Sequence, residues 1–225
     1  MTSAIPADWI CDGASLPVLC FPEVILYPEG VVPLLVRSSE HLGIVHGAQA
    51  ARLPLVTVAV DPKLDSQQQE HLPGVGSLAR VLCNQPLQEG GEVVLLRGIG
   101  RVAIEPVAAA EHSASADFSV RATRLQDRYP QDPAIDRDHR CLELLAGLAN
   151  CRGRLNELPP DFHVSGQILL GQLCDLIAQL LGFPNETSQQ LLETLNVDLR
   201  SDLLLDAIRA KLRQERPFPP EFSRN

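Results

Sequence analysis

The spacing of apolar residues changes across residues 125–136, and this change restricts the possible folds more than any other feature of the sequence. Before this segment, short apolar runs alternate with proline and glycine, which is typical of strands joined by turns. After it, apolar residues recur about every 3.6 positions, as they do in amphipathic helices. Pro130 and Pro133 within the segment favour a break in regular structure. The sequence therefore predicts an α+β fold in which a β-rich part precedes a helical part.

This division predicts five consecutive regions. They are an N-terminal extension, a β domain, a linker, a helical bundle and a tail, expected at residues 1–15, 16–124, 125–136, 137–216 and 217–225. With 225 residues and 45% hydrophobic content, the chain can form a core without metal or disulfide support. We therefore expect both parts to fold through apolar packing.

Seven apolar runs in the first part have the length and the boundaries of β-strands. Pro17, Pro22, Pro28 and Pro33 lack a backbone donor, so we expect the first two strands to be edge strands or to contain bulges. Residues 89–91 supply the positive-φ positions that a hairpin needs. The candidate strands span residues 16–20, 31–36, 55–60, 77–84, 92–97, 101–107 and 118–124.

Helical signals occur once within the β-rich part and four times after the linker. Ser38 or Ser39 can cap the first helix. Thr187 begins a capping-box pattern before the third of the later helices. Because the connections between the four later helices are short, we expect a small antiparallel bundle. These helices are predicted around residues 142–148, 169–180, 187–195 and 198–212.

The charge balance excludes several functions. The chain has 19 basic and 28 acidic residues, a net charge of −9, which argues against a nucleic-acid partner bound through its phosphates. The only lysines are Lys63 and Lys211, and neither follows a glycine, so a P-loop ATPase is excluded. The same scarcity leaves few bases for a Ser-Lys hydrolase.

No pattern in the sequence predicts a catalytic, metal or cofactor site. The six histidines are scattered without the spacing that brings two imidazoles onto one metal ion. Cys20, Cys83 and Cys174 lie on apolar faces and are interpreted as small buried hydrophobic residues. Gly98 and Gly100 match part of a dinucleotide fingerprint, but strand residues follow them, so we predict a turn between strands instead.

The sequence also predicts where the protein resides. No apolar run approaches 18 residues, so we expect neither a membrane span nor a membrane partner. The N-terminus lacks the features of a secretory signal, and the cysteines do not suggest a disulfide framework. A cytoplasmic location follows as the expectation.

Several sequence blocks resemble one known family. The run LPVLCFPEVILYPEGVVPLLV at residues 16–36 resembles the opening of the Lon protease N-terminal, substrate-binding domain, with a strand, a proline-containing turn and a second strand. The resemblance implies a PUA-like pseudobarrel followed by a helical bundle. Further blocks agree in order: VGSLARV at 75–81, EGGEVVLL at 89–96, RGIGRVAI at 97–104, LCDLIA at 173–178 and QLLETLNVDLR at 190–200.

The resemblance also implies a function. It points to a stand-alone, non-catalytic Lon-domain protein, without the ATPase and peptidase modules, that recognises exposed hydrophobic or extended segments of unfolded or partly folded polypeptides. A separate protease is a further partner that it suggests. The candidate contacts are Phe21, Tyr27, Leu34 and Val36, for which the alternative is packing between the barrel and the bundle. RNA binding by a PUA-like barrel is the second hypothesis, and a cryptic hydrolase is the third.

Overall fold

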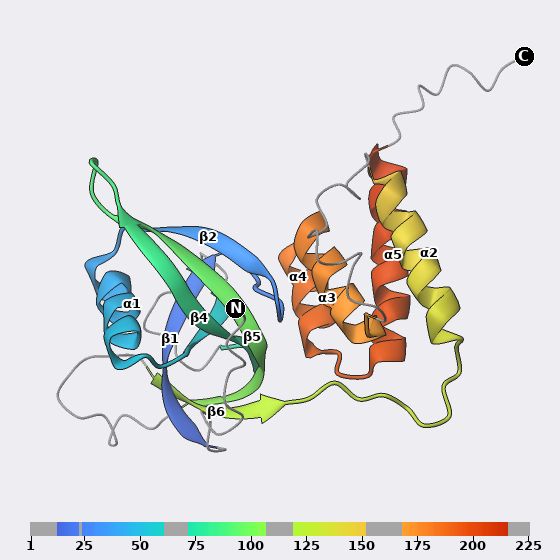
Figure 1. The fold of residues 1–225 in the computed structure, drawn as a ribbon, viewed down its shortest axis with the longest axis horizontal. Helices are drawn as coiled ribbons and strands as arrows, with labels where there is room; N and C mark the ends of the chain where they lie inside the picture. The colour runs from blue at the N-terminus through green and yellow to red at the C-terminus, as the bar shows by residue number, and fades with distance from the viewer. Residues whose placement is uncertain (1–12, 23, 61–71, 107–118, 152–167, 216–225) are drawn as a thin grey trace, which may run out of the picture. The chain divides into compact units, whose positions relative to one another are not determined.

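The computed structural model describes residues 13–22, 24–60, 72–106, 119–151 and 168–215 (Figure 1). Within these ranges no helix has the length and the apolar character needed to cross a membrane. The strands are β1 Ala14–Pro22, β2 Val31–Val36, β3 Leu55–Val60, β4 Val75–Pro86, β5 Glu92–Pro106 and β6 Ser119–Leu125. The helices are α1 Ser39–Ala51, α2 Arg137–Asn150, α3 Leu170–Leu181, α4 Asn185–Glu193 and α5 Val197–Glu215.

β5 closes the sheet into a barrel. The strands are hydrogen-bonded in the order β2-β5-β4-β3-β1-β6, and β6 also pairs with β5, so that all strands except β2 form a closed ring. β2 pairs with the first part of β5, and β6 pairs with its last part. The expected pseudobarrel and the α+β class are therefore confirmed, and β2 is an edge strand as predicted.

β5 also differs from the prediction. Residues 92–97 and 101–107 were expected as two strands with a turn at Gly98 and Gly100, but one continuous strand covers Glu92–Pro106. The turn prediction was wrong because both glycines lie inside the strand, next to a shift in its register with β4 between Leu78 and Ala79. Glycine within a strand is typical of such irregularities.

β1 accommodates its prolines in a way that the sequence did not predict. It pairs antiparallel with β6 through residues 14–17 and parallel with β3 through residues 18–22. It is therefore neither an edge strand nor a strand with two neighbours along its whole length. Pro17 is the last residue of the pairing with β6, so its missing N–H falls where β1 changes partner.

Two apolar clusters fill the barrel and the space under α1. The first joins buried residues of α1 to the core-facing residues of β2 and β5, and the second lies among the remaining strands. Ser38 caps α1 as predicted, since its side chain accepts a hydrogen bond from the His41 N–H. The first cluster contains Leu19, Leu26, Leu34, Val36, Ile44, Val45, Ala48, Leu55, Ala79, Val94 and Leu96.

The described residues form two compact units. The first unit holds the described residues up to Gln126 together with Pro184–Glu193, and the second holds the described residues of Asp127–Phe183 and those from Thr194 onward. The predicted bundle at 137–216 included α4, whereas the structure groups α4 with the barrel. Each unit has its own buried apolar residues.

α4 is held against the barrel by buried polar side chains. The Tyr27 hydroxyl donates to the carbonyl oxygen of Ser188 at 2.8 Å. Arg101, which is also buried, donates from Nε to the carbonyl oxygen of Leu192 at 2.9 Å. Both acceptors belong to α4. A buried polar group without a partner is costly, so these two hydrogen bonds favour α4 in this position.

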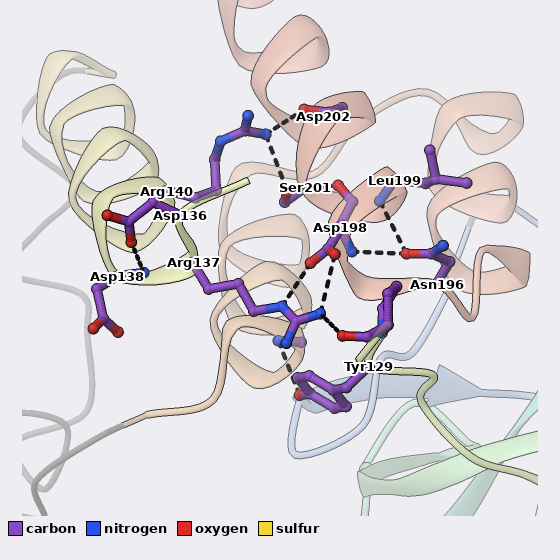
Figure 2. A network of polar contacts seen from close by, with 12 residues as sticks. Tyr129, Asp136, Arg137, Asp138, Arg140, Asn196, Asp198, Leu199, Ser201 and Asp202 are labelled. Carbon is purple, nitrogen blue, oxygen red and sulfur yellow. Dashed lines mark hydrogen bonds and ion pairs between the residues drawn. The ribbon is translucent and has the colours of Figure 1, made fainter. Parts of the chain in front are cut away.

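In the second unit, α2 and α5 run parallel to each other. Arg137 near the start of α2 donates to both carboxylate oxygens of Asp198 near the start of α5, at 2.8 and 3.0 Å. Further along both helices, a Cβ at Gly147 would lie 3.1 Å from the Ile208 side chain. Figure 2 shows Arg140 making the next contact with α5. The expected antiparallel arrangement was wrong for this pair, because α4 belongs to the first unit, so that α3 is the described helix of the second unit that separates α2 from α5 in sequence.

A buried arginine joins α5 to the start of the second unit and to α3. The Arg200 side chain is 1% exposed, and its Nη1 donates to Asp127 Oδ1 at 2.9 Å. Its Nε lies 3.6 Å from Asp175 Oδ1 and makes no hydrogen bond. Burial acts to lower the pKa of Arg200, but the charges of Asp175 and Asp127 and the hydrogen bond to Asp127 outweigh it, so the pKa is raised. A Cβ at Gly171 would overlap the Asp127 carboxylate.

The Glu92 carboxylate connects the hairpin of β4 and β5 to α1. This contact predicts a pH dependence of the protein's stability. Hydrogen bonds from Asn84 and His46 lower the pKa of Glu92. Because the pKa is lower in the folded state, the contribution of Glu92 to stability is present above its unfolded pKa, about 4.3, and is lost as the pH falls through the folded value. We expect Glu92→Gln to reduce the urea midpoint more at neutral pH than near pH 3, because the contribution of the carboxylate decreases below its unfolded pKa.

Urea titrations of both proteins at the two pH values would test this expectation. Glu89→Gln, in the turn of the same hairpin, is the control. If Glu92→Gln lowered the midpoint equally at both pH values, the carboxylate would not be the source of the stabilisation.

Candidate functional site

One face of the hairpin and of β2 is apolar and exposed. In β2, Val32, Leu34 and Val36 belong to the core cluster or pack against it, so the alternate residues point to the other side. Strand register places the matching residues of β5 and β4 beside them: Pro33 lies opposite Leu95, which lies opposite Cys83. We call this surface the outer sheet face; it consists of Val31, Pro33, Leu35, Cys83, Val93 and Leu95.

The exposure of these side chains distinguishes the outer sheet face from ordinary surface. Val31 is 46% exposed and Leu35 is 49% exposed, and both are large apolar residues. Pro33 and Cys83 are also exposed, whereas the other two members are half-buried. Single exposed apolar residues are normal, but a contiguous group across three strands is typical of an interaction surface.

Arginines flank this apolar surface. Arg97 lies opposite Val31 in the register of β2 and β5, and Arg80 lies opposite Arg97 in the register of β5 and β4. Arg37 is exposed directly after the end of β2. Glu29 pairs with Arg97 through its carboxylate. The surroundings of the outer sheet face are therefore more positive than the chain as a whole.

The backbone of β2 has one side available for hydrogen bonding. Gly98 N–H donates to the carbonyl oxygen of Gly30 at 2.9 Å, so Gly30 points towards β5. N–H and C=O groups alternate in direction along a strand, and those of Val32, Leu34 and Val36 consequently also point towards β5. The backbone groups of the alternate residues point the other way. Among the described residues, no strand pairs with β2 on that side.

The structure places the four predicted contact residues mainly inside the first unit. Tyr27, Leu34 and Val36 are 2%, 7% and 1% exposed. Phe21 is half-buried against the core cluster, with its ring 5.7 Å from that of His41. Contact of a partner with these side chains stays a prediction, and for the three buried ones it would require the core to open. Their exposed neighbours in β2 were not predicted.

The sequence contained one indication of which half of β2 is exposed, but its apolar pattern alone did not identify that half. The strand reads VVPLLV, in which every residue is apolar, so alternation alone does not tell which half faces the core. Pro33 was the informative residue: its nitrogen cannot donate, so it belongs to the half of the strand whose backbone faces an open edge.

Cys20 and Cys174 lack the low thiol pKa of reactive cysteines. Burial and the charge of Glu40 raise the pKa of Cys20 to about 11. Burial also raises the pKa of Cys174 to about 12, so neither thiol forms a thiolate near neutral pH. Cys83 is exposed, and its prediction as a buried residue was wrong because a register shift between Val81 and Cys83 turns it outward.

Metal ligands are not gathered in the described ranges. No group of three or more His, Cys, Asp or Glu side chains there is arranged to hold a metal ion.

Known proteins with similar sequences are Lon proteases. The chain is 28% identical over 222 residues to a Lon protease of Paraburkholderia phytofirmans, covering 94% of this chain and 25% of that protein. It is 25% identical over 204 residues to Lon protease of Escherichia coli K12, covering 88% of this chain and 25% of that protein. The chain thus spans about a quarter of the length of these relatives.

Solved structures of Lon N-terminal domains share the fold of this chain. The N-terminal domain of Mycobacterium avium complex Lon protease matches with a TM-score of 0.65 and 23% identity, over 87% of this chain and 98% of that one. A Lon N-terminal domain protein from Xanthomonas campestris matches with a TM-score of 0.59 and 16% identity, over 86% of this chain and 98% of that one. These two likenesses show the fold. Residues 15–210 match the model of one family, and the chain belongs to it: the substrate-binding domain of ATP-dependent protease La (LON).

Proposed function

We propose that this protein binds segments of other polypeptides through the outer sheet face and performs no chemistry on them. The observation that carries this proposal is the exposed apolar surface across β2, β5 and β4, beside an open strand edge. The family's description as a substrate-binding domain, together with the Lon proteases among its relatives, supports a polypeptide as the ligand.

The chemistry of the surface suits unfolded chains. Unfolded or partly folded polypeptides expose apolar side chains that a folded protein buries, and removing such area from water stabilises a complex by about 25 cal/mol per Å². Ordering a flexible segment opposes this gain. A surface of a few strands therefore gives affinities on the order of micromolar.

The remaining parts of the proposal concern the cellular setting. We place the protein in the cytoplasm, which the free thiols of Cys20, Cys83, Cys141 and Cys174 support. The similarity to Lon proteases supports an accessory role to a separate protease. The net charge of −9 disfavours nucleic acid as the ligand.

Leu35→Asp tests the site directly. Because the substitution places a charge in the middle of the outer sheet face, we expect affinity for a permanently unfolded protein to fall about tenfold or more, equivalent to about 1.4 kcal/mol. Leu53→Asp is a matched control: Leu53 is 48% exposed against 49% for Leu35, and it lies in the same unit outside the outer sheet face. Fluorescence anisotropy with a labelled, reduced and alkylated protein would measure both affinities.

Two results would contradict the proposal. Equal losses in Leu35→Asp and Leu53→Asp would show that the outer sheet face is not the site. Tighter binding to RNA than to unfolded protein, with a steep loss as salt increases, would favour the nucleic-acid hypothesis instead.

A further inference from the structure

We infer that the bound polypeptide segment adds to the sheet as an extended strand along the open edge of β2, and that an acidic residue beside its apolar stretch favours it. This inference rests on the proposed function, because it concerns the same surface. It specifies the conformation of the ligand and its chemical class, neither of which follows from an apolar surface alone.

The first support is the hydrogen-bonding capacity of β2. The backbone groups of Val31, Pro33 and Leu35 face away from β5, as the bond between Gly98 and Gly30 establishes. This edge offers three carbonyl oxygens, but only two N–H groups because Pro33 lacks one. An extended segment can satisfy these groups while its alternate side chains continue the outer sheet face.

The second support is that the exposed side chains and the outward-facing backbone groups belong to the same residues. Val31 and Leu35 are exposed on the outer sheet face, and their backbone groups also face the open edge. A strand added there would therefore bury apolar surface and make main-chain bonds in one step. Native proteins usually protect edges of this kind, and Pro33 alone gives only partial protection.

The third support is the charge around the edge. Arg37 is exposed directly beyond the end of β2, where the added strand would pass. Arg97 lies in register with Val31 near the other end, but Glu29 pairs with it. A segment with a carboxylate beside its apolar stretch complements Arg37, and this charge would favour encounter at low salt.

A second copy of the chain fits the edge less well than such a segment. Two β2 strands paired antiparallel about their centre would bring Pro33 opposite Pro33, where both central donors are missing. Each copy also carries a net charge of −9, and like charges oppose association. The occupant is therefore expected to be an extended segment of another polypeptide.

N-methylated peptides test the inference without altering the protein. The probe is a short capped peptide in which valine and threonine alternate and glutamate stands at both ends. One derivative is methylated at every valine nitrogen and the other at every threonine nitrogen. In an added strand, only one of these two sets of N–H groups faces β2. We expect one derivative to bind tenfold or more weakly, and the other to bind about as well as the unmodified peptide.

A pair of variants at one position tests the protein side. Leu35→Pro and Leu35→Ala both remove the leucine side chain, but only the proline also removes an N–H from the open edge. Pro33 already occupies a position of the same orientation, so β2 can hold proline there without losing a bond to β5. We expect Leu35→Pro to bind the peptide about threefold to tenfold more weakly than Leu35→Ala, the effect of one hydrogen bond. Circular dichroism would verify that both variants fold.

The outcomes separate this inference from the proposed function. If both methylated derivatives bind as well as the unmodified peptide, strand addition is overturned while polypeptide binding stands. If the peptide does not bind but an unfolded protein does, the inferred ligand class is overturned. If neither binds, both proposals fail. A dimer in sedimentation experiments that Leu35→Pro abolishes would assign the edge to a second copy and overturn the inference.

Discussion

Replacing Arg200 with leucine is expected to destabilise the second unit by about 3–5 kcal/mol, a large part of the stability of a typical domain. Arg200 is 1% exposed, and its positive charge faces Asp127 and Asp175. Without it, Asp175, which is 4% exposed in its side chain, loses the nearby positive charge of Arg200. The cost arises from this loss of charge compensation at a buried carboxylate and not from the loss of favourable contacts alone.

The same helix provides the control for this experiment. Arg209 also pairs with an aspartate of α5, Asp206, at 3.2 Å, but its side chain is 61% exposed. Exposed ion pairs contribute little, so Arg209→Leu is expected to change stability by less than about 1 kcal/mol. Urea unfolding followed by helical circular dichroism would measure both variants, since α2, α3 and α5 belong to the second unit.

A double substitution separates the charge effect from the loss of packing. Arg200→Leu combined with Asp175→Leu removes the buried cation together with one buried anion, and we expect it to recover part of the loss. If the double variant were less stable than Arg200→Leu alone, the destabilisation would come from packing around the guanidinium, and the electrostatic explanation would be wrong.

The buried arginine illustrates what the sequence could not show. Arg200 stands three residues after the buried Val197 and four before the buried Leu204, but arginine is usually exposed, so its residue type argued against a core position. Its partners lie in other segments: Asp127 precedes α2, and Asp175 is in α3. Only tertiary structure brings these segments together, and no local pattern reports such an arrangement.

Local patterns were more informative for the strands. β2 and β3 have the predicted bounds, and Gly90 and Gly91 adopt positive φ in the predicted hairpin turn. These features depend on residues close in sequence, which is why they could be predicted. The parallel course of α2 and α5 depends on the path of the whole chain. It could not be inferred from short connections.

The candidate site could be predicted from the sequence only in part. Its strand and its edge position were predicted, but the choice of Leu34 and Val36 selected the half of β2 that faces the core. Because all residues of β2 are apolar, the decision depends on which side α1 covers. The outer sheet face therefore required the structure, although Pro33 pointed to the correct half.

Gly98→Ala is the second substitution for which we expect a large effect, a loss of about 3 kcal/mol or more in the stability of the first unit. A Cβ at this position would overlap the carbonyl oxygen of Tyr27 and lie 2.8 Å from its carbonyl carbon. The overlapping atoms belong to the backbone, so no rotamer change relieves the clash. The connection between β1 and β2 would have to move, and Glu29 N–H would lose its 2.9 Å bond to Gly98. Displacing Tyr27 would also weaken its hydroxyl bond to α4.

Gly100→Ala, two positions further along β5, is the matched control for Gly98→Ala. The nearest atom to a Cβ there is Arg124 Nε at 3.9 Å, an ordinary contact, so we expect a change within about 0.5 kcal/mol. Urea unfolding of both variants, with hydrogen exchange of the β5 amides to assign the loss to the first unit, would measure the difference. Similar stabilities for the two variants would mean that the turn before β2 tolerates a side chain at residue 98. In that case the irregularity of β5 would explain the glycine at residue 98, and the close approach of the Tyr27 carbonyl group would not.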